Sequence, residues 1–336
     1  MMSSSISIII PCLNEEKYIA NCIESIISSD IDYSRSEIIF VDGGSSDKTV
    51  MIIDEYIKKY PIIKLLSNPK RYTPISMNMG IKSSVGDYIF ILSAHAKYES
   101  NYFKRLTYHC KEINASCVGG VLVTDTKNSN RKSNSIKEIL THKFGVGNAS
   151  FRTGVDEITK VDTVAFGCYA KETFEKYGYF DERLIRNQDI ELNKRIIHGG
   201  GEIYLIPEIK ATYYARDNFK DLSKNNFENG KWNILTAYYT KTLNSLSLRH
   251  FIPLIFVLSL LIPLLLSFID INFLWIAVLS LSSYLALVIM LSLKLRDESR
   301  SFYYLVSSFL TLHLSYGFGS LIGIFSVIKR VIKGKT

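Results

Sequence analysis

The chain has 336 residues, 47% of them hydrophobic, and a formal net charge of +8 at pH 7. This length exceeds that of one small domain and fits a catalytic domain with an appended segment. No basic helix with interleaved aromatic residues and no zinc-ligand spacing accompanies the positive charge, which argues against a nucleic-acid partner.

The N-terminus, MMSSSISIIIPC, does not have the pattern of a signal peptide. It lacks a basic segment, and Pro11 and Asn14 interrupt a short apolar run. We therefore expect the soluble part of the chain to stay in the cytoplasm. The five cysteines have no CxxC spacing, and their odd number argues against a complete disulfide framework. We expect them to be reduced and buried.

Short β-branched strands alternate with helices along the first hundred residues. The expected strands are Ile6–Ile10, Glu37–Val41, Ile62–Leu66 and Tyr88–Leu92, and the expected helices are 15–27, 47–59 and 74–83. Asn14 stands at the N-cap position of the first helix. The strands do not alternate polar with apolar residues. They therefore predict an α/β fold with a parallel sheet covered by helices on both faces.

Three polar loops follow these strands, at residues 11–15, 42–46 and 93–95. In parallel sheets, ligands bind beyond the carboxyl ends of the strands. The loops therefore predict a binding site at that edge. No GxGxxG motif follows the first strand, which argues against a dinucleotide-dependent oxidoreductase.

The composition changes abruptly after His250. Phe251–Phe268 and Ile271–Leu293 contain no charged residue, and Phe302–Ile328 contains only His313. Each run approaches or exceeds the roughly 20 apolar residues that cross a bilayer. Basic residues flank the runs, which is typical of contact with anionic lipid. They are Lys294, Arg296, Arg300, Lys329, Arg330, Lys333 and Lys335.

The first two runs predict a hairpin whose turn, near Asp270, lies outside while its basic end returns inside. A third crossing would place the basic tail outside, against the positive-inside tendency. Gly317, Gly319 and Gly323 would allow a bent or re-entrant segment. The number of crossings therefore stays at two or three.

Four segments carry a family resemblance: SIIIPCLNEEKYIANCIESI, EIIFVDGGSSDKTV, RYTPISMNMGIKSSVGDYIFIL and LIRNQDIELNKRI. Together they resemble glycosyltransferase family 2, the inverting nucleotide-sugar enzymes with a GT-A fold. GVGNASFRTG, VDTVAFGCYAKETFEKYGYFDERLIRNQDIELNKRI and FENGKW are similar to the succinoglycan-type membrane glucosyltransferases of that family. The resemblance implies a Rossmann-like, mostly parallel GT-A domain at 1–235, an interfacial linker at 236–250 and a membrane region at 251–336.

The resemblance implies a nucleotide-sugar site in the polar loops. It assigns to this site Pro11, Asn14, Glu15, Asp42, Gly43, Arg71, Ser93 and Ala94. Within the set, Asp42 would hydrogen-bond the base or ribose, beside glycines that let a ligand approach closely. Two other interpretations stay open: Asp42 stabilises its own turn, and Glu15 compensates a helix dipole.

The loop Ser93-Ala94-His95 stands where the family holds a divalent metal. His95 can ligate Mn²⁺ through a neutral imidazole and suits Mg²⁺ less well, so Mn²⁺ is the expected ion. Such an ion stabilises the charge of a leaving diphosphate. Ser93 stands in place of an aspartate and removes one negative charge. The alternatives are metal-independent transfer, with Lys70 or Arg71 neutralising the diphosphate, and an inactive domain.

Asp189 is the expected general base, which takes the proton from the acceptor hydroxyl in an inverting transfer. Such a base typically contributes ~10²–10⁴-fold in rate. A helix over 190–197 follows directly, so an N-cap role for Asp189 is the alternative interpretation. The expected acceptor-side residues are Arg152, Phe166, Gly167, Arg186, Gln188 and Trp232. Two of them have an open alternative: Arg186 as a surface cation, and Trp232 as an aromatic that fills the interface to the membrane helices.

These features predict a membrane-bound hexosyltransferase that moves a sugar, with glucose expected, from a UDP-sugar to a polyprenyl-diphosphate-linked oligosaccharide. The expected role is bacterial exopolysaccharide or other surface-polysaccharide synthesis. The expected place is the bacterial inner (plasma) membrane, in contact with its lipids, with the catalytic domain in the cytoplasm. Two alternatives stay open: transfer directly to polyprenyl phosphate, and a non-catalytic scaffold of a polysaccharide-assembly complex.

Overall fold

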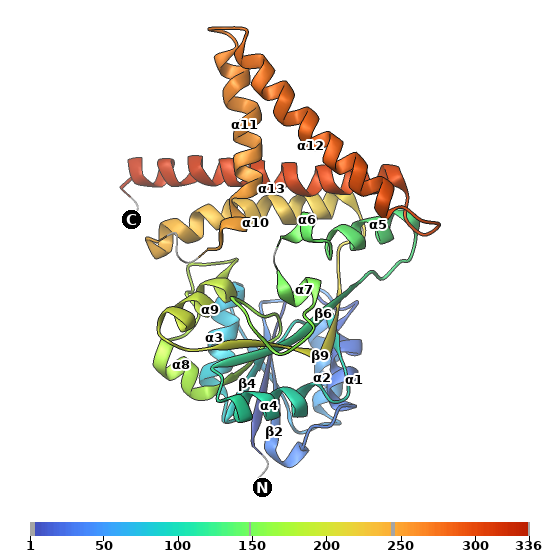
Figure 1. The fold of residues 1–336 in the computed structure, drawn as a ribbon. Helices are drawn as coiled ribbons and strands as arrows, with labels where there is room; N and C mark the ends of the chain where they lie inside the picture. Colours follow the sequence, from blue (N-terminus) through green and yellow to red (C-terminus); the bar gives the residue numbers. More distant parts are fainter. Residues whose placement is uncertain (1–3, 148, 243–245, 335–336) are drawn as a thin grey trace. The chain divides into compact units, whose positions relative to one another are not determined.

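The computed structural model describes residues 4–147, 149–242 and 246–334. Lys335, expected in the basic tail, lies outside the described residues. The chain forms two compact units (Figure 1). Residues 1–124 and 149–214 make up the sheet unit, and residues 125–148 and 215–336 make up the helical unit.

The sheet unit contains a mixed sheet with helices on both faces (Figure 1). Its strands are β1 (Ile6–Cys12), β2 (Ser36–Asp42), β3 (Ile63–Ser67), β4 (Tyr88–Ile91), β5 (Ala96–Tyr98), β6 (Cys117–Asp125), β7 (Thr159–Lys160), β8 (Cys168–Ala170) and β9 (Ile203–Tyr214). Its helical segments are α1 (Ile19–Ile27), η1 (Tyr33–Arg35), α2 (Thr49–Ile57), α3 (Thr73–Ser83), α4 (Tyr102–Ile113), α7 (Ser150–Thr153), α8 (Lys171–Tyr177) and α9 (Gln188–His198).

The first four strands pair in parallel, as their apolar sequences predicted. β1 pairs with β2 and with β4, and β3 pairs with β2. The order along the sheet is β3-β2-β1-β4-β8-β6-β9-β5, and the pairings of β4 with β8 and of β8 with β6 are antiparallel. The carboxyl ends of β1, β2 and β4 therefore meet at one edge, which brings the three polar loops together.

Successive side chains of β1 enter two separate cores, because strand side chains alternate between faces. Ile8 and Ile10 join the core that contains Ile23 of α1 and Leu106 of α4. Ile9 joins the core that contains Ile81 of α3, together with Leu192 of α9. The sheet is thus covered on both faces, which confirms that expectation. The five cysteines, all within the described residues, are free and buried, as expected.

The first helix begins later than its sequence suggested. α1 starts at Ile19 rather than Glu15, and its N-cap is Tyr18 instead of Asn14. Asn14 adopts φ 57°, and its Oδ1 accepts a hydrogen bond from the backbone N–H of Ser46. The prediction that Asn14 is the N-cap was wrong, because its side chain bonds to a neighbouring loop rather than to the helix that follows.

The helical unit consists of helices from two separate segments of the chain (Figure 1). They are α5 (Arg131–Ile139), α6 (Lys143–Val146), α10 (Phe219–Thr240), η2 (Leu248–His250), α11 (Ile252–Leu266), α12 (Phe273–Leu295) and α13 (Phe302–Ile332). All three apolar runs are helical, as expected. By length and composition α12 and α13 could each cross a membrane, and α11 has 15 residues.

The glycines of the third run, which would allow a bent or re-entrant segment, do not interrupt it, since α13 is one continuous helix of 31 residues. The compact units also divide the chain at other places than the resemblance implied. The expected boundary at residue 235 falls inside α10, and residues 125–148 belong to the helical unit. A resemblance marks where similar sequence ends, whereas the unit boundary depends on which elements pack together.

Candidate active site

A pocket of about 300 Å³ opens in the sheet unit where β1, β2 and β4 end. Many of the residues expected at a site line it: Pro11, Glu15, Gly43, Arg71, Ser93, His95, Phe166, Gly167, Gln188 and Asp189. The pocket thus joins the three polar loops to segments that follow them by more than seventy residues.

The other residues expected at the site do not line the pocket. Asn14, in the loop after β1, and Asp42, the last residue of β2, are not among the lining residues, and Ala94 is buried at 2% exposure. Arg152 lies on α7, and its guanidinium stacks on Tyr213 at 5.6 Å from the ring centroid. The remaining two residues lie outside the pocket lining: Arg186 in the loop before α9, and Trp232, which is buried, on α10 of the helical unit.

Asp42 holds its own turn together. Its carboxylate accepts hydrogen bonds from the backbone N–H of Gly44 at 2.8 Å and of Ser45 at 3.0 Å, and from the Ser45 hydroxyl. These bonds use most of the acceptor positions of the carboxylate. The geometry matches the turn-stabilising interpretation of Asp42, and its contact with a base or ribose stays a prediction.

The first two polar loops interlock through hydrogen bonds. The backbone N–H groups of Asn14 and Glu15 donate to the hydroxyls of Ser45 and Thr49, at 2.9 and 2.7 Å. Because Glu15 is anchored through its backbone, its carboxylate is held at a defined place in the pocket. The helix-dipole interpretation of Glu15 does not describe this arrangement, since α1 begins four residues later.

Glu15 and His95 form a hydrogen-bonded pair inside the pocket. His95 Nδ1 lies 3.1 Å from Glu15 Oε1. An ionised carboxylate only accepts, so the proton of this bond belongs to Nδ1. The neutral imidazole then presents its lone pair at Nε2. A carboxylate that fixes the tautomer in this way is the usual partner of a metal-ligating histidine.

The donor set at this loop fits a divalent ion held jointly by the protein and a ligand. Among the described residues, no three histidine, cysteine or carboxylate side chains gather as an all-protein metal site. His95 Nε2 is a nitrogen donor that Mn²⁺ accepts, and phosphate oxygens would complete the coordination. Mn²⁺ and Mg²⁺ stay undecided by this geometry.

Replacing Glu15 with glutamine is expected to weaken Mn²⁺ binding about 10–100-fold, because the amide no longer fixes the tautomer of His95. Titration followed by Mn²⁺ electron paramagnetic resonance, without any sugar donor, measures this directly. Glu16→Gln is the matched control, since Glu16 accepts from the backbone of Lys48. Equal losses in both variants would contradict the positioning role of Glu15.

Hydrogen bonds of its backbone hold Ser93 in place. Its N–H donates to the hydroxyl oxygen of Tyr98 at 3.0 Å, and the same hydroxyl lies 3.0 Å from the Ser93 carbonyl. Tyr98 is fully surrounded by the core. These bonds tie the loop that carries His95 to the core. Tyr98 was not expected from the sequence, and its position shortly after the loop was the available signal.

Left-handed backbone conformations gather around the pocket. Arg71 has φ 65°, Phe166 has φ 53° and Asn187 has φ 61°. Such conformations cost of order 1–3 kcal/mol each in residues other than glycine and concentrate at functional sites. The carbonyl of Phe166 accepts a hydrogen bond from Tyr102 Oη at 2.7 Å, which holds that residue in place.

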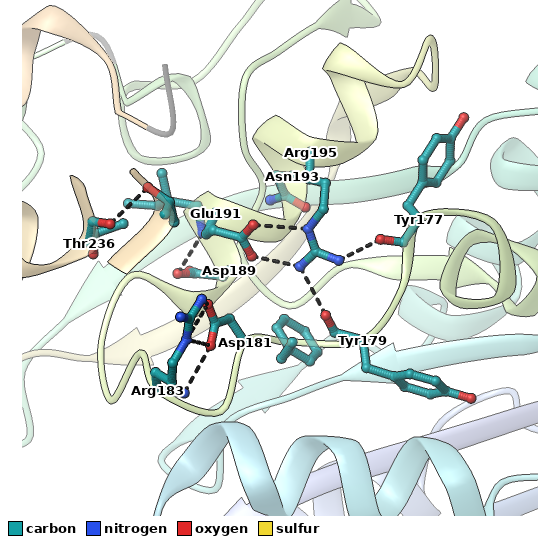
Figure 2. Close-up of polar contacts among 12 residues, drawn as sticks. Tyr177, Tyr179, Asp181, Arg183, Asp189, Glu191, Asn193, Arg195 and Thr236 are labelled. Atoms are coloured by element: carbon teal, nitrogen blue, oxygen red, sulfur yellow. Dashed lines mark hydrogen bonds and ion pairs between the residues drawn. The ribbon is translucent and has the colours of Figure 1, made fainter. Parts of the chain in front are cut away.

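Asp189 lies in the first turn of α9, two residues after the N-cap, Asn187. The N-cap interpretation of Asp189 is therefore wrong. The position of α9 is fixed elsewhere: Arg195 bonds to Glu191 and to the carbonyl of Tyr179 (Figure 2). Residues two apart on a helix do not face each other. The Glu191 ion pair therefore leaves Asp189 available to the pocket.

The environment of Asp189 favours its action as a general base. Desolvation inside the pocket raises the pKa of Asp189 above its ordinary value. Hydrogen bonding from the backbone N–H of Ile190 and the positive charge of Arg152 partly offset that rise. A carboxylate with a raised pKa accepts a proton more readily, which suits a general base.

Gln188 offers a second polar group to a ligand. Its Oε1 is buried in the pocket lining and has no hydrogen-bond partner among the described residues. An unsatisfied buried acceptor is costly, and a ligand hydroxyl that donates to it would remove the cost. Other lining residues were not expected from the sequence: Thr73, Ser76, Met77, Tyr169 and Phe180. They come from α3 and from segments with no polar motif.

Residues 7–177 match the family model described as "Glycosyl transferase family 2". A Methanococcus voltae protein, named dolichyl N-acetyl-alpha-D-glucosaminyl phosphate 3-beta-D-2,3-diacetamido-2,3-dideoxy-beta-D-glucuronosyltransferase, is 35% identical over 67% of this chain and 71% of its own length. The succinoglycan biosynthesis protein ExoA of Rhizobium meliloti is 28% identical over 64% of this chain and 65% of its own, slightly under two thirds.

Two solved structures share the fold. The mannosyltransferase PcManGT of Pyrobaculum calidifontis, in complex with GDP-Man and Mn²⁺, aligns with a TM-score of 0.59 and 12% identity over 94% of this chain and 88% of that one. Residues 1–349 of TarS from S. aureus align with a TM-score of 0.54 and 16% identity over 96% and 92%. These likenesses confirm the predicted GT-A architecture.

Proposed function

The chain belongs to glycosyltransferase family 2, and from this premise we propose that it transfers a hexose from a UDP-sugar to a lipid-linked glycan. The observation that supports the proposal is that Asp189, whose pKa is raised, lines the same pocket as the hydrogen-bonded pair Glu15–His95. In this proposal Asp189 is the base and the loop of His95 binds the diphosphate, which are the two functions that an inverting transfer needs.

In the proposed reaction the acceptor oxygen forms a bond to the anomeric carbon while the bond from that carbon to the diphosphate breaks. Asp189 takes the proton of the acceptor hydroxyl, and UDP leaves. When bound at His95, a divalent ion would supply neutralisation of the charge on the diphosphate. Gln188 and Arg152 would orient hydroxyl or anionic groups of the substrates, since Gln188 carries an unsatisfied acceptor.

The relatives support a lipid-linked acceptor and leave the donor open. The printed name of the Methanococcus voltae relative describes a dolichyl sugar phosphate and a glucuronosyl group, and that of the Rhizobium meliloti relative describes succinoglycan biosynthesis. Solved structures with the fold contain GDP-Man or UDP-GlcNAc. We retain UDP-glucose as the proposed donor, in exopolysaccharide or other surface-polysaccharide synthesis.

We also place the protein at the inner (plasma) membrane, with the sheet unit on the cytoplasmic side. The apolar helices α11, α12 and α13 and the basic residues beside them support this location.

The test is a transfer assay with the detergent-purified protein, labelled UDP-glucose and a polyprenyl-diphosphate-linked acceptor, with UDP-GlcNAc and GDP-mannose in parallel. Extension of the acceptor supports the proposal. A lipid-monophosphate sugar, formed when polyprenyl phosphate is supplied, would replace it with direct transfer to the lipid. No product and no UDP binding would favour the non-catalytic scaffold. The presence of Ser93 in place of an aspartate is the sequence feature that supports that alternative.

The pH profile of transfer is expected to fall on the acid side at a pH above the ordinary pKa of aspartate. Asp189 works as a base only when ionised, so activity is present above its raised pKa and is lost as the pH falls through it. Arg152→Gln removes a charge that lowers this pKa, so the acid limb should move to higher pH. The measurement is kcat/KM against pH in both proteins, and an unmoved limb would contradict the coupling.

A further inference from the structure

α13 packs along the whole of α10 within the helical unit (Figure 1). Near the start of α10, Phe219 contacts Tyr304 with ring centroids 6.2 Å apart. Near its end, the guanidinium of Arg330 lies 5.6 Å from the ring centroid of Tyr239. The two helices therefore run side by side, in the same direction, from residue 304 to residue 330 of α13.

Glycines bring the two helices into backbone contact. A Cβ added at Gly230 would lie 2.0 Å from the carbonyl oxygen of Tyr316, and one at Gly319 would lie 1.9 Å from the carbonyl oxygen of Phe227. The Ser320 hydroxyl donates to the Gly230 carbonyl at 3.1 Å. Contact this close along one face is a property of the folded pair, and α13 cannot change its position without α10.

The composition of α10 does not suit the hydrocarbon core of a bilayer. It carries five charged side chains, Lys220, Asp221, Lys224, Glu228 and Lys231, along with several asparagines. Charged residues are expensive at the centre of a bilayer. Because α13 is bound to α10 over its length, α13 can cross the hydrocarbon core only by taking these charges with it.

The opposite face of α13 is apolar and exposed. Phe318, Ile322, Phe325, Ile328 and Ile332 follow one another at spacings of four, three, three and four residues, which places them in one stripe. Their exposed fractions lie between 42% and 80%. Lys329 lies on the same face between Ile328 and Ile332, and Lys333 follows the last residue of the stripe. An apolar stripe with basic residues fits the headgroup and acyl boundary of an anionic bilayer.

The α11–α12 hairpin has a different character. α12 exposes apolar residues widely, including Trp275 at 70% and Leu279 at 67%. Its 23 residues correspond to about 34 Å at 1.5 Å per residue, enough for the hydrocarbon core. The helical unit thus combines a hairpin suited to insertion with a helix pair suited to the surface.

We propose that α13 lies along the surface of an anionic lipid bilayer, with the stripe from Phe318 to Ile332 facing the lipid, while the α11–α12 hairpin inserts. The basic tail then stays on the side of α10, and so on the side of the sheet unit, to which residues 215–218 join α10. This removes the conflict with the positive-inside tendency. The inference rests on the proposed membrane location but not on the proposed sugar transfer.

The first test measures depth in vesicles of phosphatidylglycerol and phosphatidylethanolamine. Bimane is attached to the full-length protein at Phe318→Cys, at Ile332→Cys and, as a deep reference, at Leu281→Cys, and lipids with shallow and deep quenchers are compared. The native cysteines are buried, so background labelling is low. We expect equal, shallow depths at residues 318 and 332. A crossing helix would separate them by about 21 Å, and that result, or no quenching at any position, would overturn the proposal.

The second test asks on which side of the membrane the tail lies. A membrane-impermeant maleimide is applied to Lys58→Cys, at the C-cap of α2, and to Lys333→Cys, both at exposed positions. We expect both variants to be labelled in inside-out vesicles and neither in spheroplasts. Labelling of Lys333→Cys in spheroplasts would overturn the proposal. Transfer activity is assayed separately on the same variants, so a wrong topology and a wrong reaction give different results.

Discussion

Replacing Asp189 with asparagine is expected to reduce sugar transfer by ~10²–10⁴-fold while leaving UDP binding unchanged. The amide keeps the size of the side chain but cannot take the proton of the acceptor hydroxyl. Because Asp189 is not the N-cap of α9, the exchange should not destabilise that helix. The measurements are kcat for transfer and calorimetric titration with UDP.

Glu175→Gln is the control for this exchange, since Glu175 is an exposed carboxylate of α8 outside the pocket lining. It should transfer sugar at the wild-type rate. Transfer by Asp189→Asn at more than a tenth of the wild-type rate would assign the base to another group. Loss of UDP binding together with transfer would indicate damage to the pocket rather than loss of a base.

Replacing His95 with alanine is expected to abolish the dependence of UDP binding on Mn²⁺. In the unchanged protein, UDP should bind more tightly with Mn²⁺ than with a chelator, and in His95→Ala the two titrations should coincide. A bound divalent ion stabilises developing charge by several kcal/mol, so transfer should also fall by roughly 10²–10³-fold. His198→Ala, at the exposed end of α9, is the control.

Equal binding of UDP in Mn²⁺ and chelator by the unchanged protein would contradict the metal role of His95. The cationic side chains at the pocket would then bind the diphosphate. Arg71 lines the pocket, and Lys70 precedes it at an exposed position. Arg71→Gln would in that case weaken UDP binding in both conditions.

The fold could be predicted because its signals are local. The apolar strands around Ile8, Ile39 and Ile89 lack polar alternation, and only a sheet covered on both faces buries such runs. The helix boundaries were less accurate, as Asn14 shows. The choice between capping a helix and bonding to a neighbouring loop depends on Ser46, 32 residues away.

The sequence by itself determined the family, the parallel part of the sheet, the loops that carry Glu15, His95 and Asp189, and the three apolar helices, because residue type and spacing encode these features. Only the tertiary structure showed that Glu15 bonds to His95, that Asp42 is used by its own turn, and that α13 is packed against a charged helix. The physical reason is that each of these depends on which distant groups share a hydrogen bond or a packing face. Hydropathy reports the preference of a single segment for lipid, and the neighbour that a segment packs against decides whether that preference can be met.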